Sequence, residues 1–135
     1  MKRLVGIDYG RKRLGIAFTD PAGLTVQGQP TVVVSGFRDA LKQVAEAIVG
    51  SEAGCIVLGL PLNMDGTRGE MAEEVERFGQ ALSERSGVKV AYWDERLTSE
   101  QAKRIVSGQK RKERGDIDRV AAALMLESYL SANPI

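Results

Sequence analysis

Short apolar runs bounded by turn residues mark the first part of the chain. Residues 4–7 and 14–18 are aliphatic runs on either side of a basic, glycine-containing turn, a pattern that predicts a strand, a hairpin turn and a second strand. Residues 25–34 are rich in Thr and Val and follow a turn at 20–23, so they predict a third strand, antiparallel to the second. The chain is therefore expected to begin with three consecutive strands.

Apolar residues recur at helical spacing in later segments. Residues 37–49 predict a helix that Gly50 ends, and residues 70–85 predict an exposed amphipathic helix with acidic side chains in its first turns. A short helix is expected from residue 98 or 99 to about 106, and a last helix from about 116 to about 130. Helices therefore dominate the second part of the chain.

Two further strands separate these helices, at 55–59 and 88–93. The order of elements predicts an α/β fold with a mixed five-stranded sheet, in which three antiparallel N-terminal strands precede two crossover strands and helices flank the sheet. Ligands of such sheets collect at the carboxyl ends of the strands. This rule brings Asp8, the loop 60–66 and residues 94–95 toward one edge.

Length and composition favour one compact domain over residues 1–135. The chain is 43% hydrophobic and has a single cysteine, Cys55, so no disulfide can form within it and a reducing compartment, the cytoplasm, is expected. No apolar run approaches the roughly 20 residues needed to cross a bilayer, and the N-terminus lacks the apolar segment of a signal peptide. We expect neither export nor a membrane partner.

The absence of histidine narrows the chemistry. It removes the Ser-His-Asp and Cys-His nucleophile systems, most zinc sites and any imidazole base, and leaves carboxylates, Lys, Tyr or a metal. The net charge is only +1, but residues 1–13 carry five basic residues against one acidic, and residues 103–119 carry seven against three. A polyanion would therefore be attracted to particular faces of the molecule.

Asp8 is the first candidate metal ligand, because it follows the apolar run of a predicted buried strand. An unpaired carboxylate there would cost several kcal/mol or shift its pKa until it becomes neutral, so a cation, a basic partner or a metal should lie nearby. Pairing with Arg11, Lys12 or Arg13 at the hairpin end is an equally simple interpretation. Other acidic residues must separate the two.

Four motifs in order resemble one known family. They are GIDYG at 6–10, GLPLNMDG at 59–66, DERLT at 94–98 and GDID at 115–118 followed by Ala121-Ala122. Together they resemble the YqgF (RuvX) family, although each alone would be weak support. The resemblance implies a ribonuclease H-like fold, related to the Holliday-junction resolvase RuvC, and a cytoplasmic nuclease that processes the 5′ end of the small-subunit (pre-16S) ribosomal RNA precursor.

Carried over by position, the resemblance implies a catalytic and metal-binding triad of Asp8, Glu95 and Asp118. Two Mg²⁺ or Mn²⁺ ions could activate a water, relieve charge on the phosphorus and stabilise the leaving oxygen, so histidine is not required. Asp94 competes with Glu95, since adjacent residues of an extended segment point in opposite directions. Asp116 competes with Asp118, and its position also suits helix capping.

Basic and polar residues near these acids are candidates for substrate binding. Residues 107–115 form a charged stretch that is too polar for the core and directly precedes Asp118, so its side chains could follow a sugar-phosphate backbone. Arg96 could hold a phosphate or pair with Asp94, and the sequence does not separate the two. The candidate nucleic-acid-binding residues are Arg11, Lys12, Asn63, Arg96, Lys110, Arg111, Lys112 and Arg114.

These features together predict a metal-dependent endonuclease that acts on structured nucleic acid, with RNA precursor processing preferred. A Holliday-junction resolvase is the alternative, and it would act on branched DNA as a homodimer. The opening strands also resemble the phosphate-binding hairpin of the actin, hexokinase and acetate-kinase group, but that group needs two domains. A non-catalytic nucleic-acid- or protein-binding module is a further alternative, disfavoured by the intact triad.

Overall fold

A computed structural model describes residues 3–23, 25–97 and 114–133, and for residues 114–119 it describes the backbone alone. The predicted helix at 98–106 and nearly all of the stretch 107–115 lie outside the described residues. The elements are, in order, β1 (Arg3–Asp8), β2 (Arg13–Thr19), β3 (Val26–Gly28), β4 (Val32–Val33), α1 (Phe37–Ile48), β5 (Ala53–Leu60), α2 (Glu70–Ser86), β6 (Lys89–Asp94), a 3₁₀ turn (Glu95–Leu97) and α4 (Arg114–Ala132).

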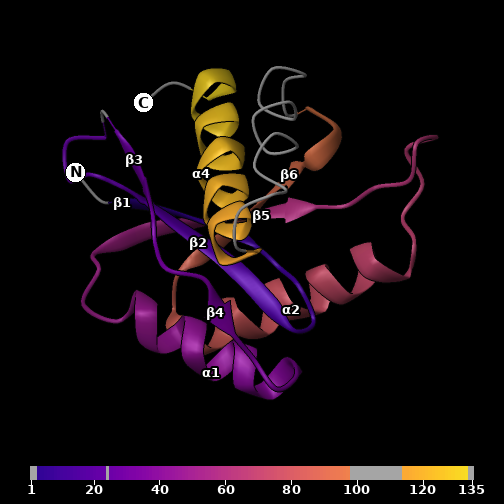
Figure 1. Cartoon of the computed structure of the whole chain (residues 1–135), viewed down its shortest axis with the longest axis horizontal. Helices are drawn as coiled ribbons and strands as arrows, with labels where there is room; N and C mark the ends of the chain where they lie inside the picture. The colour runs from indigo at the N-terminus through magenta and orange to yellow at the C-terminus, as the bar shows by residue number, and fades with distance from the viewer. Residues whose placement is uncertain (1–2, 24, 98–113, 134–135) are drawn as a thin grey trace.

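One mixed sheet forms the centre of the molecule, with the strand order β3-β2-β1-β5-β6. The β1–β2 and β2–β3 pairs are antiparallel, whereas β1–β5 and β5–β6 are parallel. Helices α1 and α2 lie against one face of the sheet and α4 crosses the other (Figure 1). The predicted α/β architecture, with three N-terminal antiparallel segments and two crossover strands, is confirmed.

The third predicted strand is corrected by the structure. Residues 25–34 form two short strands, β3 and β4, which both pair with β2, so the described sheet has six strands where the sequence predicted five. Gly28 pairs with Ala17 and Val32 pairs with Leu14. The segment from β3 to β4 therefore advances four residues, whereas β2 advances three. Pro30 lies in this interval and has no N–H to donate, which explains why the pairing is interrupted there.

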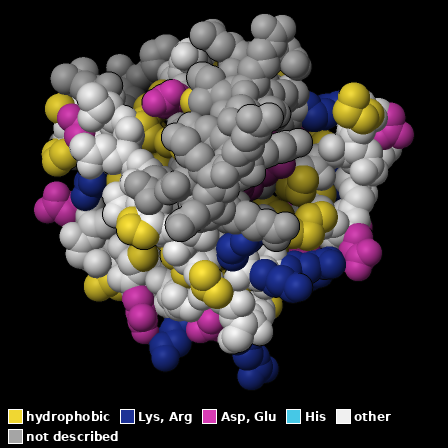
Figure 2. Space-filling view, viewed as in Figure 1, with side chains coloured by type: hydrophobic (Ala, Val, Ile, Leu, Met, Phe, Trp, Pro, Cys, Tyr) yellow, Lys and Arg dark blue, Asp and Glu magenta, His cyan; other side chains and the backbone are white. Residues whose placement is uncertain are grey.

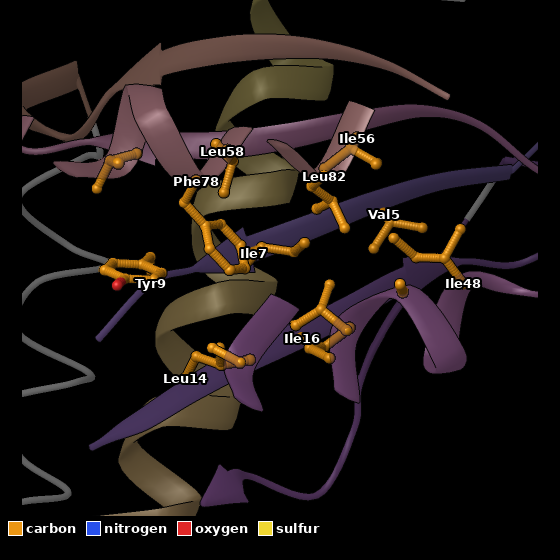
Figure 3. Packing of buried hydrophobic residues seen from close by; sticks show 14 of the residues in the cluster. Val5, Ile7, Tyr9, Leu14, Ile16, Ile48, Ile56, Leu58, Phe78 and Leu82 are labelled. Atoms are coloured by element: carbon orange, nitrogen blue, oxygen red, sulfur yellow. The ribbon is translucent and has the colours of Figure 1, made fainter. Parts of the chain in front are cut away.

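Helices α1 and α2 cover one face of the sheet and enclose the larger of its two hydrophobic clusters. Alternate residues of β1 and β5 point to this side and pack with the apolar stripe of α2 (Figure 3). Phe78 is fully buried there and meets Tyr9 at a ring distance of 4.6 Å. The cluster includes Val5, Ile7, Leu14, Ile16, Val44, Ile48, Ile56, Leu58, Val75, Phe78 and Leu82.

The opposite face carries α4 and smaller side chains. Ala17 and Val57 of the strands pack with Ala122, Met125 and Leu126 of the helix. Close approach depends on a glycine, because a Cβ added to Gly6 would lie 2.9 Å from the Cβ of Leu126. The edge strand is held by Trp93, whose ring packs edge-on against Tyr129 at 5.7 Å. Within the described part of the chain, no helix is long and apolar enough to span a bilayer.

Candidate active site

Strand alternation places Asp8 on the α4 face of the sheet. Val5 and Ile7 belong to the cluster under α1 and α2, so Gly6 and Asp8 lie on the opposite side, and Gly6 does contact α4. Asp8 is the last residue of β1, and the neighbouring strand pairs Ile7 with Leu58. The carboxylate therefore projects at the end of the sheet, beside Gly59.

Glu95 reaches the same place from the other edge of the parallel strands. It directly follows β6 and begins the 3₁₀ turn, two residues after Trp93, which packs against α4. Its carboxyl group is partly buried and shares a hydrogen bond with the carboxyl group of Asp8. Two acids from strands that are not adjacent in the sheet are thus in direct contact.

Gly59 makes this contact sterically feasible. A Cβ added at this position would lie 2.6 Å from Oε1 and 3.1 Å from Cγ of Glu95. Gly59 pairs with Trp93 in the neighbouring strand, so the space left by its missing side chain opens on the α4 face, where the Glu95 side chain lies. The glycine therefore forms the floor of the acidic site.

The electrostatics of the acidic pair favour a positive charge. Burial is the main cause that raises the pKa of Glu95 above its ordinary value, and the charge of Asp94 raises it further, while the hydrogen bond with Asp8 acts in the opposite direction. Either a proton or a cation must offset two carboxylates in contact. Carboxylate oxygens are the ligands that Mg²⁺ and Mn²⁺ prefer, so the donor chemistry fits a hard divalent cation.

The third predicted acid, Asp118, lies in the first turns of α4, where only the backbone is described. It precedes Ala122 by four residues and Met125 by seven, which places it on the helix stripe that packs on the sheet. Asp116 is about 200° away around the helix axis from that position. Among residues with described side chains, no three acidic or sulfur ligands form a complete metal site.

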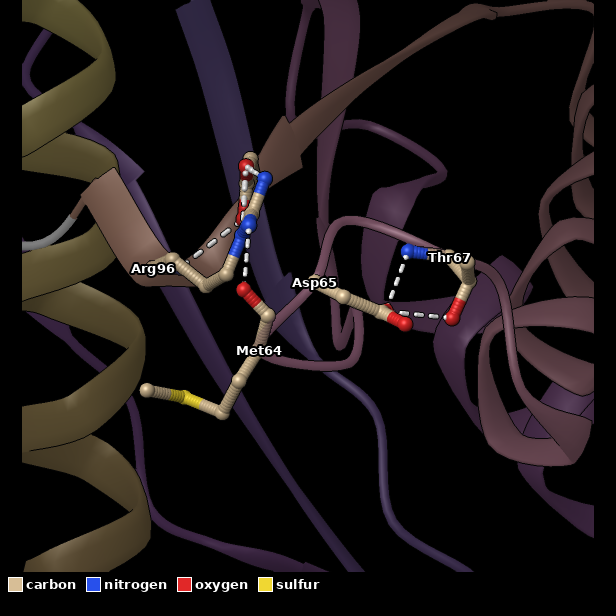
Figure 4. Close-up of polar contacts among 5 residues, drawn as sticks. Met64, Asp65, Thr67 and Arg96 are labelled. Atoms are coloured by element: carbon tan, nitrogen blue, oxygen red, sulfur yellow. Dashed lines mark hydrogen bonds and ion pairs between the residues drawn. The ribbon is translucent and has the colours of Figure 1, made fainter.

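Asp94 and Arg96 form a separate ion pair. The guanidinium donates from Nε at 3.1 and 3.0 Å and from Nη2 at 2.8 Å to the Asp94 carboxylate, which lowers the pKa of Asp94. Its Nη1 donates to the carbonyl of Met64 at 3.2 Å (Figure 4). Arg96 thus joins the end of β6 to the loop after β5, and of the two interpretations left open by the sequence, the structure contains the pairing with Asp94.

Asn63 stabilises the loop in which it lies. Its Nδ2 donates to Oγ1 of Thr67 at 2.9 Å, and its backbone N–H donates to the Thr67 carbonyl at 2.9 Å. Asp65 accepts hydrogen bonds from the Thr67 amide and hydroxyl (Figure 4). Gly66 adopts a φ of 87°, which an L side chain would resist. The predicted substrate contact of Asn63 stays a prediction, since its amide serves the loop here.

The predicted substrate residues of the β1–β2 turn differ from one another. Arg11 is paired with Glu74 of α2 through Nε at 3.0 Å and Nη2 at 2.9 Å, whereas the Lys12 side chain is exposed. Figure 2 shows Lys and Arg side chains gathered on the face around this turn. The side chain of Arg114 and all of Lys110, Arg111 and Lys112 lie outside the described residues.

Two features at this end of the sheet were not predicted from the sequence. Gly59 belongs to a recognised motif, but its role under Glu95 depends on the register of strands β5 and β6. The sequence alone does not reveal that register. Glu74 was part of an ordinary amphipathic helix, and only the packing of α2 beside the β1–β2 turn brings it to Tyr9 and Arg11. Its half-buried position became visible only in the structure.

Comparisons with known proteins agree with these features. The family profile described as "RuvX: Holliday junction resolvase" matches residues 2–132. A protein of Syntrophus aciditrophicus is 42% identical over 133 residues, covering 96% of this chain and 89% of the relative, and one of Endomicrobium trichonymphae is 46% identical over 137 residues, covering 96% of both. The names of both relatives describe a pre-16S rRNA nuclease.

Solved structures with the same architecture have little sequence identity with this chain. RuvC of T. thermophilus in complex with a Holliday junction substrate superposes with a TM-score of 0.62 at 18% identity, covering 98% of this chain and 97% of RuvC. The fowlpox virus Holliday junction resolvase has a TM-score of 0.58 at 12% identity, covering 96% and 98%. These similarities confirm the predicted ribonuclease H-like fold.

Proposed function

Because this chain belongs to the RuvX family, we propose that it is a nuclease that hydrolyses phosphodiester bonds in structured nucleic acid with the help of divalent cations. The single observation that supports this most is the contact between Asp8 and Glu95 at the end of the sheet, over Gly59. Two carboxyl groups in contact and partly withdrawn from water offer the oxygen ligands that a hard divalent cation prefers.

The proposed ligands are Asp8, Glu95 and Asp118, and the proposed ions are Mg²⁺ or Mn²⁺, two in number. When bound, the ions would supply an activated water and would offset the charge that develops on the phosphate. Asp8 and Glu95 would hold them at the end of the sheet, and Asp118 would close the site from α4. Arg96 would keep the loop after β5 beside the 3₁₀ turn that carries Glu95.

The proposed substrate is the 5′ end of pre-16S rRNA during ribosome biogenesis, in the cytoplasm. Support comes from the names of relatives that share over 40% of their residues with this chain along nearly the whole length. Lys110, Arg111, Lys112 and Arg114 precede Asp118 in the sequence and are proposed to contact the backbone of the RNA, together with Lys12.

Holliday-junction resolution is the second candidate, since the family description names it and RuvC bound to a junction has the same fold. A resolvase needs two active sites related by two-fold symmetry, so it would act as a dimer. A non-catalytic binding module has no need to hold two acids in contact at the cost of stability, and the Asp8–Glu95 pair argues against it.

The first experiment tests the metal site. Asp8→Asn should abolish cleavage of a precursor RNA, lowering the rate at least about 100-fold, because a ligand is lost whereas the fold is kept. Glu46→Gln on the exposed face of α1 removes a carboxylate far from the site and is the matched control. Calorimetric Mn²⁺ binding should be lost in the first variant only. Robust cleavage by Asp8→Asn, or by the parent in excess chelator, would contradict the assignment.

The second experiment separates the two substrates. The protein is incubated with pre-16S RNA that carries its 5′ leader and with a four-way DNA junction, each with Mg²⁺ and with Mn²⁺. We expect cleavage of the RNA by a monomeric protein. Preferred cleavage of the junction, with sedimentation showing a dimer on DNA, would instead establish the resolvase.

A further inference from the structure

A groove lies at the same end of the sheet as the acidic pair, on the opposite face. Its volume is about 540 Å³, and it lies between the β1–β2 turn, the start of α1 and the exposed side of α2. Tyr9 forms part of its wall at one end of the buried cluster, with its hydroxyl oxygen away from the aliphatic side chains (Figure 3). The lining residues are Tyr9, Arg11, Gly36, Phe37, Glu74 and Arg77.

Two arginines and one acid line this groove, and Glu70 lies beside it, 3.8 Å from Arg11. Both oxygens of the one acid, Glu74, are already used: Oε1 accepts from Arg11 and Oε2 accepts from the Tyr9 hydroxyl at 2.7 Å. Arg77 is exposed and lies near enough to act electrostatically on Tyr9 and Glu74, and no ion pair within the described residues involves it. Its charge is therefore available for an anion.

An aromatic surface adjoins this charge. Phe37 is 36% exposed, and its ring is anchored edge-on against the buried Phe78 at a centroid distance of 5.6 Å. A ring held on one side and open on the other can stack on a base without losing much freedom. A guanidinium beside an aromatic ring suits a phosphate and the base attached to it.

The groove is joined to the acidic site through consecutive residues. Asp8 and Tyr9 follow one another, so their Cα atoms are about 3.8 Å apart. Asp8 turns to the α4 face whereas Tyr9 packs on Phe78 under the opposite face. A nucleic-acid chain with one phosphate at Asp8 can therefore extend around the end of the sheet, so that neighbouring nucleotides reach Arg77.

We propose that this groove binds the single-stranded segment that flanks the cut site, with Arg77 on a phosphate and Phe37 against a base. The inference rests on the proposed nuclease function and names the part of the substrate that the opposite face would hold. It predicts that the enzyme distinguishes a duplex that has a single-stranded extension from one that is blunt.

The binding test uses the Asp8→Asn chain, which we expect not to cleave, and fluorescein-labelled RNA duplexes that are blunt or carry a short 5′ or 3′ extension. Arg77→Ala should weaken binding of the RNA with one of the extensions about five- to tenfold and reduce the salt slope by about one, with little effect on the blunt duplex. Arg85→Ala is the matched control, because it removes the same charge from an exposed position two turns along α2.

Phe37→Leu tests stacking separately from charge. Leucine keeps an apolar contact with Phe78, so the fold should persist, as measured by thermal unfolding. Binding of the extended RNA should fall about fivefold, with the salt slope unchanged. In the cleaving parent background, Arg77→Ala should raise KM for the extended substrate and leave kcat unaltered.

Three results would overturn the proposal. Equal losses in Arg77→Ala and Arg85→Ala would show a general charge effect, and equal losses on blunt and extended RNA would remove the flanking strand from the groove. Self-association of the chain that Phe37→Leu abolishes, measured by sedimentation, would assign the groove to a second copy. The proposed nuclease function can fail while the groove proposal holds. In that case the parent protein binds extended RNA preferentially and Arg77→Ala removes this preference, but the parent cleaves no substrate with any divalent cation.

Discussion

Two partly buried glutamates at the same end of the sheet have opposite environments. On the α2 side, Glu74 accepts hydrogen bonds from Arg11 and Tyr9, and the bond from Arg11 is the main cause that lowers its pKa. On the α4 side, Glu95 meets the carboxyl group of Asp8, and burial raises its pKa. One acid has its counter-charges within the chain, whereas the other is placed against a second acid.

This is the difference we expect between a carboxylate that stabilises the fold and one that we propose as a metal ligand. Glu74 joins the β1–β2 turn to α2 and is satisfied by the fold itself, so its charge contributes to stability. Glu95 is held against a second acid, so its negative charge must be offset by a proton or a cation and costs stability, as we expect of a proposed metal ligand. Variants at the two positions should therefore change stability with opposite signs.

The largest expected effect is on catalysis at Glu95. Glu95→Gln should lower metal-dependent cleavage at least about 100-fold, because an amide is a weaker ligand and carries no charge. The same change should raise the stability of the metal-free protein by about 0.5–2 kcal/mol, since the amide can donate a hydrogen bond to Asp8. Cleavage assays and urea unfolding measure the two effects. A variant less stable than the parent would contradict the comparison.

The next effect compares two glycines under the α4 face. Gly59→Ala should lower cleavage about 10- to 100-fold with little loss of stability, because its Cβ meets the flexible end of Glu95, which can move away from Asp8. Gly6→Ala should instead cost about 1–3 kcal/mol of stability, because its Cβ meets the Cβ of Leu126 and must displace α4. Cleavage rates and thermal unfolding of both variants check this. The idea fails if both variants lose mainly stability.

A smaller effect is expected at Glu74. Glu74→Gln should cost about 1–3 kcal/mol of stability, because Arg11 loses the nearer of its two ionic partners and the partly buried Tyr9 hydroxyl faces a weaker acceptor. Calorimetric Mn²⁺ binding should stay close to that of the parent, since the acidic pair lies on the other face. Glu73→Gln, an exposed neighbour on α2, is the control for the loss of a helix charge. Weakened Mn²⁺ binding would show that the two faces are coupled.

The smallest effect is the response of the metal-free protein to pH. The pKa of Glu95 is raised above 4.5 in the folded state, so the cost of its charge disappears as pH falls from neutrality toward 4.5. The pKa of Glu74 is lowered below 4.5, so its stabilising contribution is present above about pH 4.5 and is lost as pH falls further. In urea unfolding, the stability gap between Glu95→Gln and the parent should narrow from about pH 7 to about pH 5. A stability gap that widens as the pH falls would contradict a raised pKa of Glu95 in the folded state.

Local patterns predicted most elements because their causes are local. Helical spacing of apolar residues predicted α1 and α2 within one residue at their ends, and the unbroken apolar run predicted β5. The prediction of one strand over residues 25–34 was wrong, because Pro30 interrupts the pairing with β2. The prediction followed the Thr- and Val-rich composition of the segment and gave too little weight to this proline. Helix α4 begins near its predicted start and ends two residues later than predicted.

At the acidic site, the sequence by itself determined which residues could carry the chemistry. A chain without histidine, with acids after its strands and motifs of a known family, leaves few other choices. Only the tertiary structure decided that Glu95 meets Asp8, that Asp94 is held by Arg96, and that Gly59 provides the space between strands. The physical reason is that periodicity describes one segment at a time, whereas these contacts depend on the register of parallel strands joined by long crossovers.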